Sequence, residues 1–527
     1  MKAIRLFSMA ALAIMMAACS SDLNEITEQP QQPQQAEGIP FKAILPAPGS
    51  DATRTALSKS GTSINVAWKA KEAGVYEGDQ IALLHNGVKD VATVTAVDGS
   101  GNATIEATIT GSPANNDDVV LVYPAASVNS TGSGTAFEPD ATYAAKQLTQ
   151  NGSLVYIGNY LDGREGSGKL SVSAGNASLK ENVTMTSEIA IWHLALFDTS
   201  LAPVNATKVT MKLGNQIIAQ ATLSGSTNEL DMCVVPKSLQ TLYAAATAAS
   251  LPTPVFCIEA TVGTTTYTYP VFTQLNLSTG TFYNSPVEMG TLGDVMGSDG
   301  KFYADGAAAT TAGATPIGVL AYIGDDATTE PTFGCGHGLV LCLKNAASDV
   351  AWSSENVSNF TGQEVTDKAG LIRTENVSGY TYTATLTANA TIADKYPAAK
   401  AAKNYTALPA PTGSMGWFLP SAQQWVKMQE GLGGLDESVI HYGNPWFDND
   451  HTAVNNWDNA MAKAGSGNYD SMKTGYLCYW SSSEGGTNTA VQLTIKASGT
   501  GSSYGFYWQG NAKNYSSTTR VRPILAF

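Results

Sequence analysis

Short runs in which apolar and polar residues alternate recur along most of the chain after residue 38. Each run has Gly, Asp, Asn or Pro close by; examples are Ile64–Trp68, Ala92–Val97, Val119–Tyr123 and Thr265–Tyr269. Alternation with a period of two places every second side chain on one face of a strand, and the flanking residues favour turns. Charged residues make up only 14% of the chain, which also favours strands over exposed helices. The pattern predicts a mainly β fold of antiparallel sandwiches.

From about Gly290 the pattern changes to more tryptophan and more helix-like segments. Ser421 directly precedes a helical pattern at Ala422–Trp425, so we expect Ser421 to cap that helix rather than act as a nucleophile. Three tryptophans are expected to pack in the core rather than contact a ligand: Trp417, Trp425 and Trp480. We therefore predict a separate α+β domain over residues 291–527.

The first residues have the pattern of an export signal. Lys2 and Arg5 precede the apolar run Leu6–Met16, which is too short to span a bilayer. The run ends in Met-Ala-Ala-Cys, which resembles the lipobox of bacterial lipoproteins. The resemblance implies a signal peptide over residues 1–18, lipidation at Cys19, and membrane contact through the attached acyl chains.

Residues 19–38 are rich in Gln and Pro and contain little that could be buried, so we expect a flexible tether. Residues 39–527 exceed the usual domain size of about 100–200 residues, which indicates about two to four domains. Removal of Lys2 and Arg5 with the signal changes the net charge from −15 to −17. Without a basic cluster, nucleic acid and anionic membrane surfaces are poor partners.

Five cysteines follow Cys19, so at least one of them is unpaired within the chain: Cys233, Cys257, Cys335, Cys342 and Cys478. Disulfides between Cys233 and Cys257 and between Cys342 and Cys478 are one interpretation, and buried core thiols are the other. The five histidines are scattered without metal-ligand spacing. We expect no metal, no cofactor and no enzyme activity.

Residues 39–290 resemble the fimbrillin-like proteins of Bacteroidales, which form surface pili. The resemblance is carried by short motifs in a fixed order: Thr53-Arg54-Thr55, Trp68 followed by Glu77–Ile81, Val122-Tyr123-Pro124, and Leu277–Tyr283. It implies two tandem antiparallel β-sandwich domains of the transthyretin-like fimbrillin type, which we place at 39–165 and 166–290. We expect Asp162–Glu165 to break the sheet before this boundary.

The resemblance also implies assembly with other pilus subunits by β-strand exchange. In such pilins an Arg-specific protease removes the lipidated segment together with the first strand. Ile39–Leu45 resembles that strand, and Arg54 lies in the polar segment that follows it. Cleavage after Arg54 would make Thr55 the first residue of the mature chain.

Residues 291–527 resemble the C-type-lectin-like domains that end many Bacteroidetes surface proteins. The motifs are Trp417–Ser421, Tyr479–Glu484 and the closing Arg520–Phe527, in which we expect Arg520 and Arg522 to pair with carboxylates. Ligand contacts are expected from aromatic residues beside Asn and Asp: Trp446, Phe447, Asp448, Asp450, Trp457, Asp458, Tyr504 and Trp508. The triplets of calcium-dependent sugar lectins are absent, although Asp448, Asp450 and Asp458 offer oxygen ligands for a cation.

Together these features predict a tip-type subunit of a surface pilus, exported as a lipoprotein to the outer membrane. The two sandwiches would serve assembly, and the lectin-like domain would bind a glycan or another cell-surface ligand. The alternative is an outer-membrane lipoprotein that captures glycans as nutrients.

Overall fold

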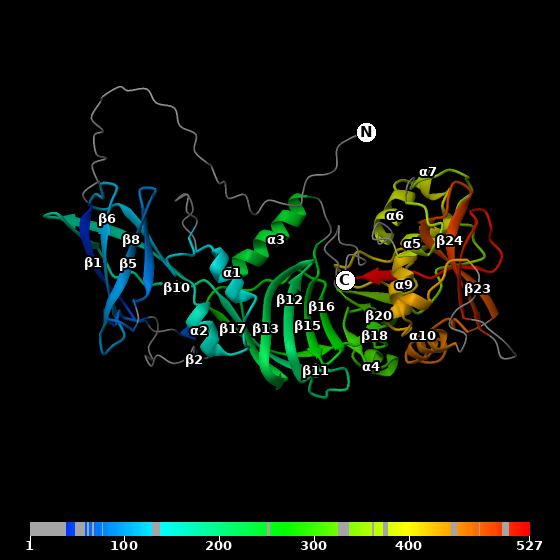
Figure 1. Cartoon of the computed structure of the whole chain (residues 1–527), viewed down its shortest axis with the longest axis horizontal. Coiled ribbons are helices and arrows are strands. Elements are labelled where there is room, and N and C mark those ends of the chain that lie inside the picture. Colours follow the sequence, from blue (N-terminus) through cyan, green and yellow to red (C-terminus); the bar gives the residue numbers. More distant parts are fainter. Residues whose placement is uncertain are drawn as a thin grey trace, which may run out of the picture.

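The computed structural model describes residues 38–47, 58–60, 63–65, 68–75, 77–128, 137–249, 253–324, 337–360, 363–372, 378–443, 451–473, 475–497 and 505–527. As expected, the fold is mainly β and contains several sheets. The sheets follow one another along an elongated molecule, with residues 291–527 at one end (Figure 1). Among the described helices, none has the length and apolarity needed to cross a membrane.

The first sheet has eight strands in the order β10-β8-β7-β4-β5-β6-β1-β9. Their bounds are β1 Ile39–Leu45, β4 Gln80–His85, β5 Val88–Val97, β6 Ala103–Ile109, β7 Asp118–Tyr123, β8 Arg164–Ser173, β9 Asn176–Leu179 and β10 Thr186–Ser187. Because β9 pairs with both β1 and β8, the sheet folds back on itself around an apolar core. The strands predicted within β5 and β7 are confirmed. Burial alternates along Ala92–Thr95 of β5, whereas the adjacent Leu121 and Val122 of β7 are both buried, each in a different apolar cluster.

The predicted domain boundary between residues 165 and 166 is wrong, because it falls inside β8. Residues 164–169 of β8 pair with β7. The expected break of the sheet at Asp162–Glu165 is also wrong, because Arg164 and Glu165 begin β8 and pair with Tyr123 and Val122. Gly166 and Gly168 continue the strand, and a Cβ at either position would lie within 2.8 Å of Val183 side-chain atoms. The absence of a side chain lets this backbone approach its neighbour closely. The first sheet therefore continues to Ser187.

The central sandwich consists of two sheets, with orders β14-β11-β17-β3-β2 and β13-β12-β15-β16. The bounds are β2 Ser58–Ser60, β3 Ser63–Asn65, β11 Ala190–Asp198, β12 Ala206–Leu213, β13 Gln216–Thr227, β14 Glu229–Val234, β15 Phe256–Val262, β16 Thr265–Val271 and β17 Thr281–Met289. Side chains from both sheets share one core, in which the rings of Trp192 and Phe256 stack with centroids 6.0 Å apart. The early hairpin β2–β3 thus belongs to the central sandwich and not to the first sheet.

Helices α1 (Ala141–Gln147) and α2 (Leu154–Tyr160) connect β7 and β8, and α3 (Pro236–Ala248) follows β14. A second apolar cluster joins side chains of β4 and β7 to α1, α2 and the central sandwich. It includes Leu84, Phe137 and Phe282, all buried. The first sheet and the central sandwich are therefore packed against each other.

The C-terminal part, residues 291–527, contains two five-stranded sheets in the orders β19-β18-β20-β21-β27 and β22-β26-β23-β24-β25. The strands are β18 Val295–Gly297, β19 Phe302–Tyr303, β20 Pro316–Ile323, β21 Gly338–Cys342, β22 Ala347–Ser348, β23 Gly475–Glu484, β24 Thr489–Ala497, β25 Phe506–Ala512, β26 Thr519–Val521 and β27 Ile524–Ala526. The α-helices are α4 Gly306–Thr311, α5 Lys368–Leu371, α6 Gly379–Leu386, α7 Ala390–Ala393, α8 Pro397–Lys403, α9 Ala422–Glu430 and α10 Thr452–Ala462.

The joint between the central sandwich and the C-terminal part has an apolar core. Val255, Cys257 and Phe272 of the central sandwich belong to the main core of the C-terminal part. The terminal Phe527 is fully buried, and its ring lies edge-on to Phe272 with centroids 6.4 Å apart. The C-terminus therefore returns to this joint instead of ending at the far end of the molecule (Figure 1).

Candidate functional sites

β1 lies between β6 and β9 in the first sheet and is held mainly by its pairing with β6. All seven of its residues pair with β6, whereas only Phe41 pairs with β9. Phe41, Ala43 and Leu45 are buried, while Lys42 and Ile44 face solvent. A single strand thus supplies one row of main-chain hydrogen bonds to β6 and one apolar ridge to the core.

The next described strand after β1 is β2, which lies in the central sandwich and not in the first sheet. The segment between β1 and β2 must therefore connect two different sheets. Arg54 and Thr55 belong to this segment and lie outside the described residues, as does Cys19.

Two aromatic residues expected at a ligand site, Trp457 and Trp508, are core residues. Both are fully buried. Trp457 Nε1 donates to the Met428 carbonyl oxygen at 3.1 Å, and Trp508 Nε1 donates to Gln429 Oε1 at 3.1 Å. Both indole N–H groups are bonded within the protein, and neither ring is exposed to a ligand. The prediction that these two residues contact a ligand is therefore wrong.

Asp458 is also engaged within the fold. Its Oδ1 accepts from the Ser471 hydroxyl at 2.6 Å and from the Met472 backbone N–H at 2.9 Å, so it orders the turn after α10. The other expected contacts lie outside the described residues: Trp446, Phe447, Asp448, Asp450 and Tyr504.

The sequence did contain a signal for the burial of Trp457. Ala453, Val454, Trp457, Ala460 and Met461 are buried along α10 and recur at helical spacing. This spacing indicates a helix face that packs on the core. It predicts the burial of Trp457 better than the neighbouring Asn and Asp residues predict a ligand site. The tryptophans predicted to be buried, Trp417, Trp425 and Trp480, are confirmed as core residues.

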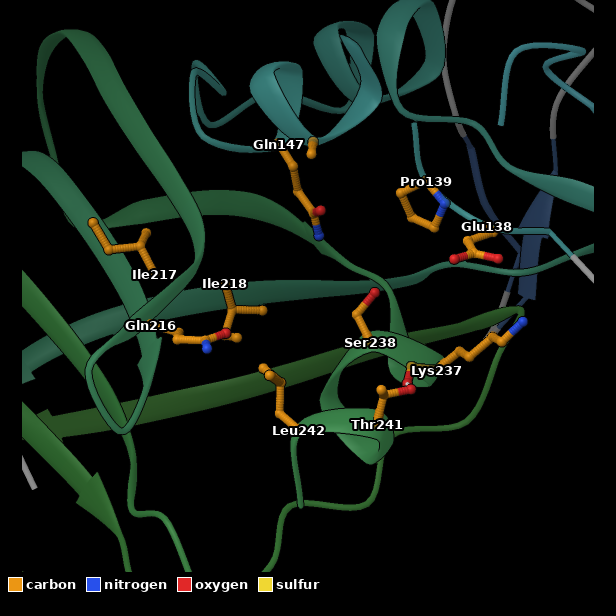
Figure 2. A pocket seen from close by; sticks show the side chains of 11 residues that line it. Glu138, Pro139, Gln147, Gln216, Ile217, Ile218, Lys237, Ser238, Thr241 and Leu242 are labelled. Atoms are coloured by element: carbon orange, nitrogen blue, oxygen red, sulfur yellow. The ribbon is translucent and has the colours of Figure 1, made fainter. Parts of the chain in front are cut away.

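A cavity of about 420 Å³ lies between α1, the start of β13 and α3 (Figure 2). Its wall combines Ile218 and Leu242 with the polar side chains of Gln147 and Lys237. Gln147 Nε2 is buried and has no hydrogen-bond partner among the described residues. The volume is in the range of small-molecule sites, and only Glu138 and Lys237 among the lining residues ionise, so the cavity can bind but offers little acid–base chemistry.

The described cysteines are buried free thiols: Cys233, Cys257, Cys342 and Cys478. The two disulfides considered from the sequence are therefore wrong, and the interpretation as core thiols is confirmed. Burial raises the pKa of Cys233 and of Cys342 to about 12, so both stay protonated and unreactive at neutral pH. Cys335 lies outside the described residues.

One thiol lies in a polar cluster that the sequence analysis missed. Ligand atoms of Cys257, Glu259 and His337 lie within 4.8 Å of one another at the joint between the central sandwich and the C-terminal part. Cys257 and Glu259 are two residues apart on β15, a spacing that puts both on one face of a strand. That spacing was readable from the sequence, but the arrival of His337 from a distant segment was not.

The two arginines near the C-terminus differ in their partners. Arg520 Nη1 pairs with Asp349 Oδ1 at 3.1 Å, as expected. Arg522 is fully buried and donates instead to the carbonyl oxygens of Cys342, Leu343 and Asp470, so its predicted pairing with a carboxylate is wrong. Its contacts stabilise the fold where β21 ends.

No protein-family model matches the chain, and a comparison with curated proteins finds no match. Among solved structures, it is similar to a fimbrial protein from Bacteroides ovatus, with 16% identity, a TM-score of 0.33, and coverage of 93% of this chain and 100% of that one. It is also similar to a protein proposed to act in cell adhesion from the same species (13% identity, TM-score 0.27, 49% of this chain and 95% of that one). A third similar structure is that of a fimbrial assembly protein from Parabacteroides distasonis, with 10% identity, a TM-score of 0.25, and coverage of 47% of this chain and 90% of that one. The sequence identities are low and all three TM-scores are below 0.5, so no function is inferred for this chain from these similarities.

Proposed function

We propose that the chain is a tip-type adhesive subunit of a surface pilus, assembled by β-strand exchange after export as a lipoprotein. The observation that carries this proposal is the position of β1. It is the first described strand, it precedes Arg54 along the chain, and it contributes a complete row of pairs to β6.

Loss of β1 would leave the kind of surface that strand exchange uses. The edge of β6 would expose unpaired backbone N–H and C=O groups, and the core beneath Phe41, Ala43 and Leu45 would open as an apolar groove. An unpaired edge beside a groove binds an extended strand through main-chain hydrogen bonds, while alternate side chains fill the groove. Cleavage after Arg54 would separate β1 from β2, which lies in the central sandwich.

The last described strand supports a tip position. β27 pairs with β21, and Ile524–Phe527 are fully buried in the C-terminal part. Because β27 is already paired within the C-terminal part, it is not available to pair with a neighbouring subunit. In this proposal the C-terminal part is a C-type-lectin-like domain that meets a glycan or another cell-surface ligand.

The test is intact-mass measurement and N-terminal sequencing of the protein from sheared surface filaments and from membranes. We expect a chain beginning at Thr55 in the filament fraction. The variant Arg54→Lys keeps the positive charge but removes the arginine, so it should remain uncleaved and absent from filaments. A diacylated chain beginning at Cys19, found only in membranes for both proteins, would contradict the pilus role and favour a glycan-capturing lipoprotein.

Adhesion needs a separate test because deletion of residues 291–527 would uncover Phe272 and Val255 at the joint. Antibody fragments raised against the whole chain and sorted by epitope avoid that damage. Fragments that bind the C-terminal part should block attachment, whereas fragments that bind the first sheet should not. Equal attachment with both sets would contradict an adhesive C-terminal part.

A further inference from the structure

Two buried atoms that have no hydrogen-bond partner among the described residues face each other at the joint. Glu259 Oε1 and His337 Nδ1 are 3.4 Å apart, and His337 is fully buried. This separation is longer than the usual N–H···O distance of about 2.7–3.2 Å. It matches the distance of about 3.3 Å between two ligands of one tetrahedral ion, each about 2.0–2.1 Å from the metal.

The opposite side of the His337 ring lies against a backbone carbonyl. Nε2 is 3.4 Å from the Val255 carbonyl oxygen, and Nδ1 is the same distance from Glu259 Oε1. In the tautomer that carries its proton on Nε2, the Nδ1 lone pair is directed at Glu259. A histidine that binds a metal through one ring nitrogen usually donates its other N–H to such an acceptor. In that tautomer Nδ1 is free to bind a cation while Nε2–H points at the Val255 carbonyl oxygen.

Glu259 is held in a similar way. Its second oxygen, Oε2, accepts from Lys212 Nζ at 2.7 Å, while Oε1 remains directed at His337. The carboxylate of a metal site is commonly fixed by a hydrogen bond to its other oxygen. Lys212 thus orients the ligand, although its positive charge lowers the affinity for a cation.

The third group supplies sulfur. Cys257 Sγ belongs to the same cluster and lies 2.9 Å from Thr268 Oγ1 on the neighbouring strand β16. Sulfur, imidazole nitrogen and one carboxylate oxygen form a ligand set typical of zinc, whereas calcium and magnesium prefer oxygen throughout. Ion binding would displace the thiol proton to solvent and leave a thiolate.

We propose that Cys257, Glu259 and His337 bind one zinc ion, which links the central sandwich to the C-terminal part. Cys257 and Glu259 come from β15, and His337 immediately precedes β21. The ion would add a cross-link between two structural units that also meet through apolar contacts and through the hydrogen bond from Thr199 Oγ1 to Asp294 Oδ2. This site is independent of the pilus role and would exist in a glycan-capturing lipoprotein as well.

The test uses the chain from Ser20 onward, which keeps every described residue, after removal of metals with a chelator. Cobalt(II) serves as a spectroscopic probe and zinc as the stabilising ion. We expect one ion per chain, a near-ultraviolet thiolate-to-cobalt charge-transfer band, and a zinc-dependent rise in Tm.

Cys257→Ser removes the sulfur ligand, and Cys478→Ser is the matched control. Both thiols are buried on strands and lie near threonine hydroxyls, but Cys478 is outside the cluster. Cys257→Ser should abolish the charge-transfer band and weaken zinc binding at least about tenfold, and Cys478→Ser should change neither. Glu259→Gln, which keeps the side-chain shape, should also weaken zinc binding and covers the case in which Cys257→Ser does not fold.

Three results would overturn the proposal. The first is failure of the parent chain to bind one ion, which would leave a direct contact between His337 and Glu259 as the explanation of their separation. The second is cobalt binding by the parent without a thiolate band. The third is an unchanged band in Cys257→Ser, which would assign the sulfur to another thiol.

Discussion

Lys513 Nζ lies 2.7 Å from Glu484 Oε1, and both side chains are fully buried in the C-terminal part. Oε2 of Glu484 accepts the backbone N–H groups of Asn359 and Phe360, at 2.8 and 3.0 Å. The Lys513 ammonium also lies over the ring of Trp352, 5.0 Å from its centroid. This buried pair therefore fixes a loop that is remote in the sequence onto the end of β23.

Removal of one member of this pair should destabilise the C-terminal part strongly. Glu484→Gln leaves the Lys513 ammonium buried without its counter-charge, for which we expect a loss of about 3–5 kcal/mol in the free energy of unfolding. Denaturant unfolding followed by tryptophan fluorescence measures this loss. The control is Lys400→Ala, which removes the exposed pair with Asp394 and should have little effect. Equal stability of the two variants would contradict a structural role for the buried pair.

The two faces of β1 should respond differently to the same loss of side-chain volume. Leu45 is fully buried and Ile44 is 59% exposed, and the two residues are adjacent on one strand. Leu45→Ala should cost about 2–5 kcal/mol because it leaves a cavity in the core. Ile44→Ala is the matched control. Amide exchange in β6, followed by mass spectrometry, should accelerate only for Leu45→Ala; equal exchange in both variants would show that β1 is not held by its apolar face.

The stability of the joint should depend on acidic pH through Asp294. Burial raises the pKa of this carboxyl above its ordinary 3.8, and nearby Asp198 adds to the rise, while the Thr291 N–H and Lys463 act in the opposite direction. The folded state therefore holds the proton more tightly than the unfolded chain. Stability should decline as pH rises from 3.8 through the raised folded value.

Asp294→Asn removes this titration and keeps an oxygen that can accept from Thr291 N–H. Unfolding midpoints of the parent and the variant should be compared across this acidic range. The parent should lose stability relative to the variant as the pH rises, because only the parent carries the raised pKa of Asp294. A variant profile parallel to that of the parent would rule out Asp294 as the source.

The cap of α9 should contribute measurably to stability. The Ser421 hydroxyl accepts the Gln424 backbone N–H at 3.2 Å, and Gln424 Oε1 accepts the Ser421 N–H at 2.9 Å. Ser421→Ala should cost about 1 kcal/mol, measured by denaturant unfolding. Ser378, at the start of α6, makes no such side-chain cap, so Ser378→Ala should cost less. Similar losses in both variants would contradict the importance of the capping box.

Local features of this fold could be predicted from the sequence. Alternation identified strands within β5, β7 and β16, and the Ser421 cap followed from its position before a helical pattern. These features depend on residues close together in the chain, where side-chain periodicity and hydrogen bonds to the nearest backbone groups decide the outcome.

The candidate assembly strand was also identified from its sequence, since Ile39–Leu45 forms β1. Its partner strand was not, because pairing with β6 depends on how the sheet closes. The same is true of β2 and β3, whose pairing places them in the central sandwich although they follow β1 in the chain.

The sequence by itself determined the mainly β character, several strands and the cap of α9, because each of these follows from local periodicity. Tertiary packing decided which polar and aromatic groups are accessible. In the folded protein Trp457 and Trp508, which the sequence suggested as ligand contacts, are buried in the core. Arg522 donates hydrogen bonds to backbone carbonyl oxygens instead of pairing with a carboxylate. Tertiary packing also brought His337 to Cys257 and Glu259, since only folding brings distant segments within the few ångströms over which side chains interact.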